Sequence, residues 1–151
     1  MHPLELEIPG LDPDERSDLE GLLVGLDQTF SLCGIEDGRV EGGVLPGRYW
    51  FATRQGVAAP LTVNEGDTRA RVELGDAPLV VRSTRRENVQ VVPAGADPFL
   101  RLAAARAWIK AAGENEARFR LHPGRYLIVG EAGIVLREVE LTADGLELAL
   151  D

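Results

Sequence analysis

Short segments in which apolar and polar residues alternate follow one another along most of the chain, and turn-forming residues separate them. A period of two is typical of strands that bury one face. In residues 146–150, for example, the three leucines fall on one face and Glu147 and Ala149 on the other. Turns spaced by about 8–12 residues favour an antiparallel β-sandwich over a fold of alternating strands and helices. The segments predicted as strands are 3–8, 20–27, 38–44, 48–54, 58–63, 68–74, 79–84, 88–93, 117–121, 125–130, 134–141 and 146–150.

The helix signals are concentrated in one place, residues 97–112. Asp97 is a good N-cap, Pro98 suits the first helical position, and Gly113 is a suitable residue just beyond the end. The intervening stretch is apolar around most of its girth, so we expect it to pack on a sheet. A similar cap pattern at residues 12–15 predicts only a short turn or loop.

The chain contains an internal similarity. The motif Pro-Gly-Arg-Tyr occurs in residues 44–51 and again in residues 121–128, with apolar neighbours in both places. An alternating segment follows each motif after a polar turn. The simplest interpretation is two tandem units, residues 1–76 and 77–151. Almost no linker separates them, so we expect the units to pack as one rigid body.

Each repeated motif predicts a strand corner. Proline fixes φ at the second position of a type II turn, and glycine supplies a positive φ at the third. The tyrosine that follows is expected to bury its ring and to hydrogen bond the backbone through its hydroxyl. These structural turn and corner residues are Pro46, Gly47, Tyr49, Pro123, Gly124 and Tyr126.

The sequence Asp37-Gly38-Arg39-Val40, followed by residues 45–49, resembles the end of a carboxypeptidase regulatory-like domain. Residues 117–126 are similar to the same pattern. Such domains are transthyretin-like (prealbumin-like) β-sandwiches. The resemblance implies a mainly β fold of two tandem antiparallel β-sandwich units. The one short helix expected in the second unit, residues 97–112, would be an insertion relative to a minimal module of this family. It also implies a non-catalytic accessory, spacer or binding module, of a kind often found in bacterial envelope or secreted proteins.

The 151 residues include 44% hydrophobic residues, enough for a core, and carry a formal net charge of −9. Residues 1–76 contain 15 acidic side chains and 6 arginines, whereas residues 77–151 contain 10 acidic and 10 basic side chains. An acidic chain is a poor partner for nucleic acid or anionic membranes. No segment is long and apolar enough to insert into a membrane. We expect a cytoplasmic protein if Met1 is the native start, and a cell-envelope protein if the chain is an excised fragment.

Few residues suit catalysis or metal binding. His2, His122 and Cys33 lack the spacing of a zinc site, so we predict no cofactor and no metal. His122 is interpreted as a turn residue and Cys33 as a small buried hydrophobe. The arginines of residues 82–120 either bind an anion or, as we expect, pair with local acids or with the acidic first unit.

Four acidic residues lie close together near the N-terminus. They form either a solvated loop with a helix cap, a docking surface for a partner, or a calcium site, although the spacing of an EF-hand is missing. These residues are Asp12, Asp14, Glu15 and Asp18.

The leading hypothesis is a non-catalytic interaction or structural module that binds a protein partner. One alternative is a small-ligand or carbohydrate-binding accessory module, in which Trp50 and Trp108 would stack on sugars. Trp50 follows Tyr49 on a strand, so one of the two rings faces inward and the other outward. We favour a core position for Trp50, with an exposed ring as the alternative. A second alternative is an enzyme with an unrecognised carboxylate site.

Overall fold

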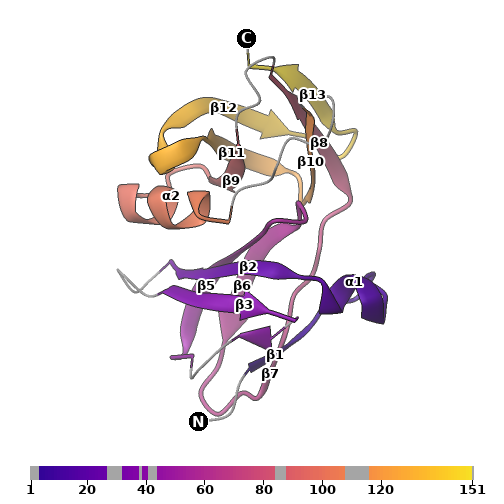
Figure 1. Cartoon of the computed structure of the whole chain (residues 1–151), viewed down its shortest axis with the longest axis vertical. Helices are drawn as coiled ribbons and strands as arrows, with labels where there is room; N and C mark the ends of the chain where they lie inside the picture. Colours follow the sequence, from indigo (N-terminus) through magenta and orange to yellow (C-terminus); the bar gives the residue numbers. More distant parts are fainter. Residues whose placement is uncertain are drawn as a thin grey trace.

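The first seven strands form a single sheet in the lower part of Figure 1. The computed structural model describes residues 4–26, 32–37, 39–40, 44–83, 88–107 and 116–150. The sheet order is β6-β5-β2-β3-β4-β1-β7, and every pair is antiparallel except the parallel pair β1–β7. The strands are β1 (Leu4–Glu7), β2 (Glu20–Gly25), β3 (Leu32–Glu36), β4 (Arg39–Val40), β5 (Gly47–Thr53), β6 (Ala58–Val63) and β7 (Arg69–Arg71).

The remaining strands form two three-stranded sheets in the upper part of Figure 1, with orders β10-β8-β13 and β12-β11-β9. The pair β8–β13 is parallel and the other pairs are antiparallel. The mainly β, sandwich-like class predicted from the sequence is confirmed, but its strands are not all antiparallel. These strands are β8 (Ala77–Arg82), β9 (Gln90–Pro93), β10 (Glu116–Leu121), β11 (Gly124–Val129), β12 (Val135–Leu141) and β13 (Leu146–Ala149).

Two α-helices and one 3-10 turn complete the described structure. Helix α1 (Pro13–Ser17) forms where only a turn or loop was expected. Helix α2 (Pro98–Ala105) begins as predicted, with Asp97 accepting a hydrogen bond from the Leu100 N–H at 2.8 Å. The predicted helix extended to residue 112, but residues 108–112 lie outside the described ranges. The 3-10 turn η1 (Glu131–Gly133) packs against α2.

Residues 4–74, which we call the first half, and residues 75–150, the second half, share their strand pairings. The antiparallel pair β5–β6 has the register of β11–β12, and β2–β5 corresponds to β9–β11. The pair β1–β4 corresponds to β8–β10, and the parallel pair β1–β7 to β8–β13. The halves differ at β3, which joins β2 to β4. Helix α2 takes the equivalent place in the chain order, and no described strand joins β9 to β10.

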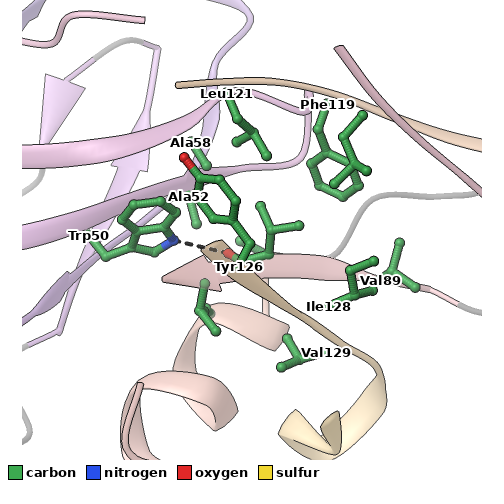
Figure 2. Packing of buried hydrophobic residues seen from close by; sticks show 14 of the residues in the cluster. Trp50, Ala52, Ala58, Val89, Phe119, Leu121, Tyr126, Ile128 and Val129 are labelled. Atoms are coloured by element: carbon green, nitrogen blue, oxygen red, sulfur yellow. Dashed lines mark hydrogen bonds between the residues drawn. The ribbon is translucent and has the colours of Figure 1, made fainter. Parts of the chain in front are cut away.

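The apolar core crosses from one half to the other. One buried cluster lies within the first half. The other lies in the second half but includes Val24, Trp50, Ala52 and Ala58 from β2, β5 and β6. Figure 2 shows Trp50 of the first half packed beside Tyr126 of the second, with ring centroids 6.2 Å apart. The halves therefore bury one continuous apolar contact.

Buried hydrogen bonds reinforce this contact. The Trp50 indole N–H donates to the Val91 carbonyl oxygen at 3.0 Å, the bond drawn in Figure 2. The Gln90 side chain is fully buried, and its Nε2 donates to the carbonyl oxygens of Thr53 at 3.1 Å and Ala107 at 2.5 Å. Satisfied buried donors of this kind fix the orientation of the segments they join, because leaving them unpaired is costly.

Both repeated corners use a tyrosine hydroxyl. Tyr49 donates to the Leu45 carbonyl oxygen at 2.6 Å, and Tyr126 donates to that of His122 at 2.5 Å. The backbone bond predicted for each hydroxyl is therefore present. The predicted type II turns are wrong in detail, since the glycines after Pro46 and Pro123 have φ of 151° and 158° and already begin strands β5 and β11. A type II turn needs a value of about +80° at that position.

Candidate functional site

A groove of about 480 Å³ opens on the side of the molecule where the first half meets strands β8 and β10. Its floor is apolar and includes Leu11, Leu19, Val57 and Val80. Small-ligand sites commonly have volumes of about 300–1,000 Å³ and apolar linings with a few polar groups. We call this the inter-half groove.

One wall of the groove is acidic and is formed by Glu15 and Asp18. Helix α1 holds these residues in place. The Asp12 N–H donates to the Glu15 carboxylate at 3.3 Å, and the Glu15 N–H donates to the Asp12 carboxylate at 2.8 Å. This reciprocal capping box sets the start of the helix. Asp12 and Asp14 are exposed outside the groove lining, so only two of the four predicted acidic residues face it.

The second half supplies a basic wall, formed by Arg118 and Arg120 of β10. These arginines alternate with the buried residues Ala117, Phe119 and Leu121, because successive side chains of a strand point to opposite faces. The carboxylate of Glu116 pairs with Arg118, and also with Arg82 at 3.6 Å. For the arginines of residues 82–120 we expected pairing with local acids, and this is confirmed for Arg82 and Arg118.

The turn between β5 and β6 connects the two walls. The Gln55 side chain donates to the Asp18 carbonyl oxygen at 2.8 Å and accepts from the Glu20 N–H at 3.1 Å. The neighbouring Gly56 carbonyl oxygen accepts from the Arg120 N–H at 2.9 Å. Both walls are therefore attached to one short turn, the acidic wall through the Gln55 side chain and the basic wall through a backbone hydrogen bond.

Two charges in the groove lining are available to a ligand. Within the described ranges, neither the carboxylate of Asp18 nor the guanidinium of Arg120 has an ion-pair partner. Arg82, in contrast, is already paired with an acidic residue. It hydrogen bonds to Glu147, and this bond raises the pKa of its guanidinium. The lining of the groove thus combines an open carboxylate from the first half, an open guanidinium from the second half and an apolar floor.

A second hollow of about 470 Å³ lies between β2, β3 and the end of α2. Its lining includes Glu20 and Arg54, whose charged groups are 3.9 Å apart. Arg106 of the second half also lines it. The hollow is more polar than the inter-half groove and part of its charge is already paired, so it is the weaker candidate for binding.

Trp50 is not an exposed stacking surface. Its side chain is 3% exposed and its indole N–H is bonded inside the core. The core position favoured from the sequence is confirmed, and the alternative of an exposed, sugar-stacking Trp50 is wrong. Burial follows from the alternation of β5, which places this ring against the second half while Tyr49 faces the first-half core. Trp108, the other residue of that hypothesis, lies outside the described residues.

The remaining candidate residues have structural contacts. His122 Nε2 lies 2.6 Å from the Glu73 carbonyl oxygen, so the ring ties the segment between the halves to the β10–β11 corner. Cys33 is half-buried, and burial raises the pKa of its thiol.

Within the described ranges, no group of three or more histidine, cysteine or acidic residues is placed so that it could hold a metal ion. The four acidic residues of the segment 12–18 therefore do not form the calcium site considered as an alternative. No helix in these ranges is long and apolar enough to cross a membrane.

Comparison with known proteins gives little further information. Neither a protein-family model nor a curated protein matches the chain. One similar solved structure is that of the Bacillus anthracis TIE protein, with a TM-score of 0.33 and 12% sequence identity. The similarity covers 98% of this chain, which spans about a third (33%) of the length of that protein. A likeness this weak supports no conclusion about family or function.

Proposed function

We propose that this protein is a non-catalytic interaction module and that the inter-half groove binds a polypeptide segment of a protein partner. The observation that carries the proposal is the pairing of an apolar floor with an open Asp18 carboxylate on one wall and an open Arg120 guanidinium on the other. A peptide segment supplies complementary groups, because it can carry an apolar side chain flanked by charges of both signs.

We further propose that the two halves are copies of one transthyretin-like module. The matching strand pairings and the two Tyr corners support this interpretation. Packing of the copies would then create a groove that neither copy has alone, because one copy supplies the acidic wall and the other the basic wall.

The proposal can be tested by selecting binders from a displayed library of random seven-residue peptides on the intact protein, followed by calorimetric titration. The test variants are Asp18→Lys and Arg120→Glu, each of which reverses one wall charge. Glu65→Lys is the matched control, because Glu65 is exposed in the turn after β6 and does not line the groove.

We expect enriched peptides to contain an apolar residue and at least one charge, and to bind each groove variant at least about tenfold more weakly than the control variant. A selection that enriches no peptide would contradict the proposal. Enriched peptides that bind all three variants equally would contradict it as well, since their site would then lie elsewhere.

A further inference from the structure

The outer edge of β10 has backbone groups directed away from its own sheet. The Arg120 N–H donates outward to Gly56 rather than to β8, and Arg120 lies opposite Pro78, which has no N–H. Residues of an antiparallel pair alternate between bonding to the partner strand and pointing away from it. Arg118 lies two residues before Arg120, so its N–H and C=O also point away from β8.

A contact on the other side of β8 confirms this alternation. Arg82 of β8 directs its carbonyl oxygen towards the β13 side, where it accepts from the Leu150 N–H at 2.9 Å. Arg82 lies opposite Glu116, so this pair does not exchange bonds and Glu116 also points outward. Apart from the bridge between Val57 and Arg120, no described strand pairs with this edge.

The first half shows what fills the same edge there. Strand β4 corresponds to β10, because Val40 pairs with Leu4 as Phe119 pairs with Leu79. Arg39 then corresponds to Arg118. On its outer edge β4 pairs antiparallel with β3, with Glu36 opposite Arg39 and Ile35 opposite Val40. In the first half, therefore, the strand at this edge places an acidic residue beside the arginine and an apolar residue beside the buried Val40.

We infer that the outer edge of β10 accepts an extended strand from the protein partner, antiparallel to β10, at the position that β3 occupies in the first half. This inference rests on the proposed function and names the binding mode. The entering strand places an acidic residue opposite Arg118 and apolar residues opposite Ala117 and Phe119, so it alternates apolar and acidic residues. Main-chain hydrogen bonds to Arg118 and Glu116 supply affinity, and the cross-strand side chains supply selectivity.

Arg118 and Phe119 also line the inter-half groove, so a strand on this edge runs beside the groove. The charge of the protein does not oppose an acidic strand here. The excess of acidic residues lies in residues 1–76, whereas residues 77–151 have 10 acidic and 10 basic side chains. Arg120 provides local positive charge without an ion-pair partner in the described ranges, whereas Arg118 and Arg82 share the carboxylate of Glu116.

The first experiment measures amide hydrogen exchange of the intact free protein by NMR. We expect fast exchange at Arg118 and Glu116 and slow exchange at Ala117 and Phe119, whose N–H groups bond to β8. Protection of Arg118 in the monomer would overturn the inference, because the chain itself would then cover the edge. Protection that increases with protein concentration would also overturn it, because the occupant would then be a second copy.

The second experiment adds the peptide acetyl-Ile-Glu-Val-Lys-Thr-amide, in which Glu is designed to face Arg118 and Lys to face Glu116. The peptide stops before the position opposite Arg120, which Gly56 and Val57 already occupy. We expect saturable shifts and new protection of the Arg118 amide. Exchanging the Glu and Lys of the peptide places like charges opposite each other and should weaken binding by about tenfold. No saturable binding, or equal binding of both peptides, would overturn the inference.

N-methylated peptides test the backbone bonds without altering the protein. Methylation of the Glu nitrogen removes the donor to the Arg118 carbonyl and should weaken binding at least about fivefold. Methylation of the following Val nitrogen is the matched control, since that N–H points away from β10. Equal effects of the two methyl groups would exclude strand addition. Library peptides that still depend on Asp18 and Arg120 would in that case leave the proposed function standing.

Discussion

At the scale of single residues, we expect the hydroxyl groups of the two corner tyrosines to contribute to the free energy of unfolding. Each hydroxyl donates to the carbonyl oxygen four residues earlier, and each ring is buried. Replacing Tyr49 or Tyr126 with phenylalanine keeps the ring and leaves that carbonyl without this donor. We expect each substitution to lower the free energy of unfolding by about 1–2 kcal/mol, measured by urea denaturation.

Arg125→Ala is the control for Tyr126→Phe, because Arg125 is exposed and adjacent in β11. Arg125→Ala should change the free energy of unfolding by no more than about 0.5 kcal/mol.

Burial raises the pKa of Tyr126, so the unfolded chain loses the hydroxyl proton at a lower pH than the folded one. Stability should therefore fall as the pH rises above about 10, and fall less steeply in Tyr126→Phe. Equal stability of Tyr126→Phe and the parent at every pH would show that the hydroxyl bond contributes nothing.

At the scale of elements, two glycines on neighbouring strands differ in the space available for a side chain. A Cβ on Gly21 of β2 would lie 2.1 Å from the Ala52 carbonyl oxygen of β5, whereas a Cβ on Gly34 of β3 would meet nothing within 4 Å. Gly21→Ala must displace backbone atoms and should lower the free energy of unfolding by about 1–3 kcal/mol. Gly34→Ala should be neutral or stabilising by up to about 1 kcal/mol, because glycine has the larger conformational entropy when unfolded.

Thermal and urea denaturation of the two alanine variants side by side check this prediction. The two glycines lie on adjacent strands, with Gly34 opposite Leu22, so any general effect of alanine on this part of the sheet would appear in both variants. If the variants lost equal stability, the close approach of β2 and β5 at Gly21 would not be the cause.

The sequence predicts most of the strands and the start of α2, but it does not predict strand β3. Alternation located most strands, and Asp97 with Pro98 located the start of α2. Strand β3 was not predicted, because Gly34 interrupts a short segment with little alternation. The strand predicted over 20–27 is confirmed by β2, although Gly21 and Gly25 weaken its local preference, because β2 is bonded on both sides, by β3 and β5. Tertiary pairing outweighs local preference in these positions.

The candidate site was predictable only in pieces. The acidic residues near α1 and the arginines of β10 are visible in the sequence, but nothing in the sequence indicates that they face one groove. Their meeting depends on how the halves pack, and that packing depends on Trp50 and Gln90, which bond across the boundary. Gln55 carries no sequence signal at all, although it ties the acidic wall to the turn at Gly56.

At the scale of the whole molecule, the shared core leads us to expect that the two halves unfold together. Val24, Trp50, Ala52 and Ala58 belong to first-half strands but are buried in the second-half cluster. A Cβ on Gly75, the first residue of the second half, would lie 2.1 Å from the His122 nitrogen, so the backbone that leaves the first half packs closely against the β10–β11 corner. Separating the halves would expose this apolar surface to water, and that cost favours one cooperative transition over two.

Two core truncations, one in each half, test this cooperativity. Leu61→Ala removes buried volume from the first-half cluster, and Ile128→Ala removes it from the second. Each should lower the free energy of unfolding by about 2–5 kcal/mol. With a shared transition, hydrogen exchange by mass spectrometry should show that either truncation reduces protection of both β5 and β11, while Glu65→Ala changes neither. If Leu61→Ala released only residues 4–72, the halves would unfold independently, and the groove would lack the fixed walls on which its proposed binding depends.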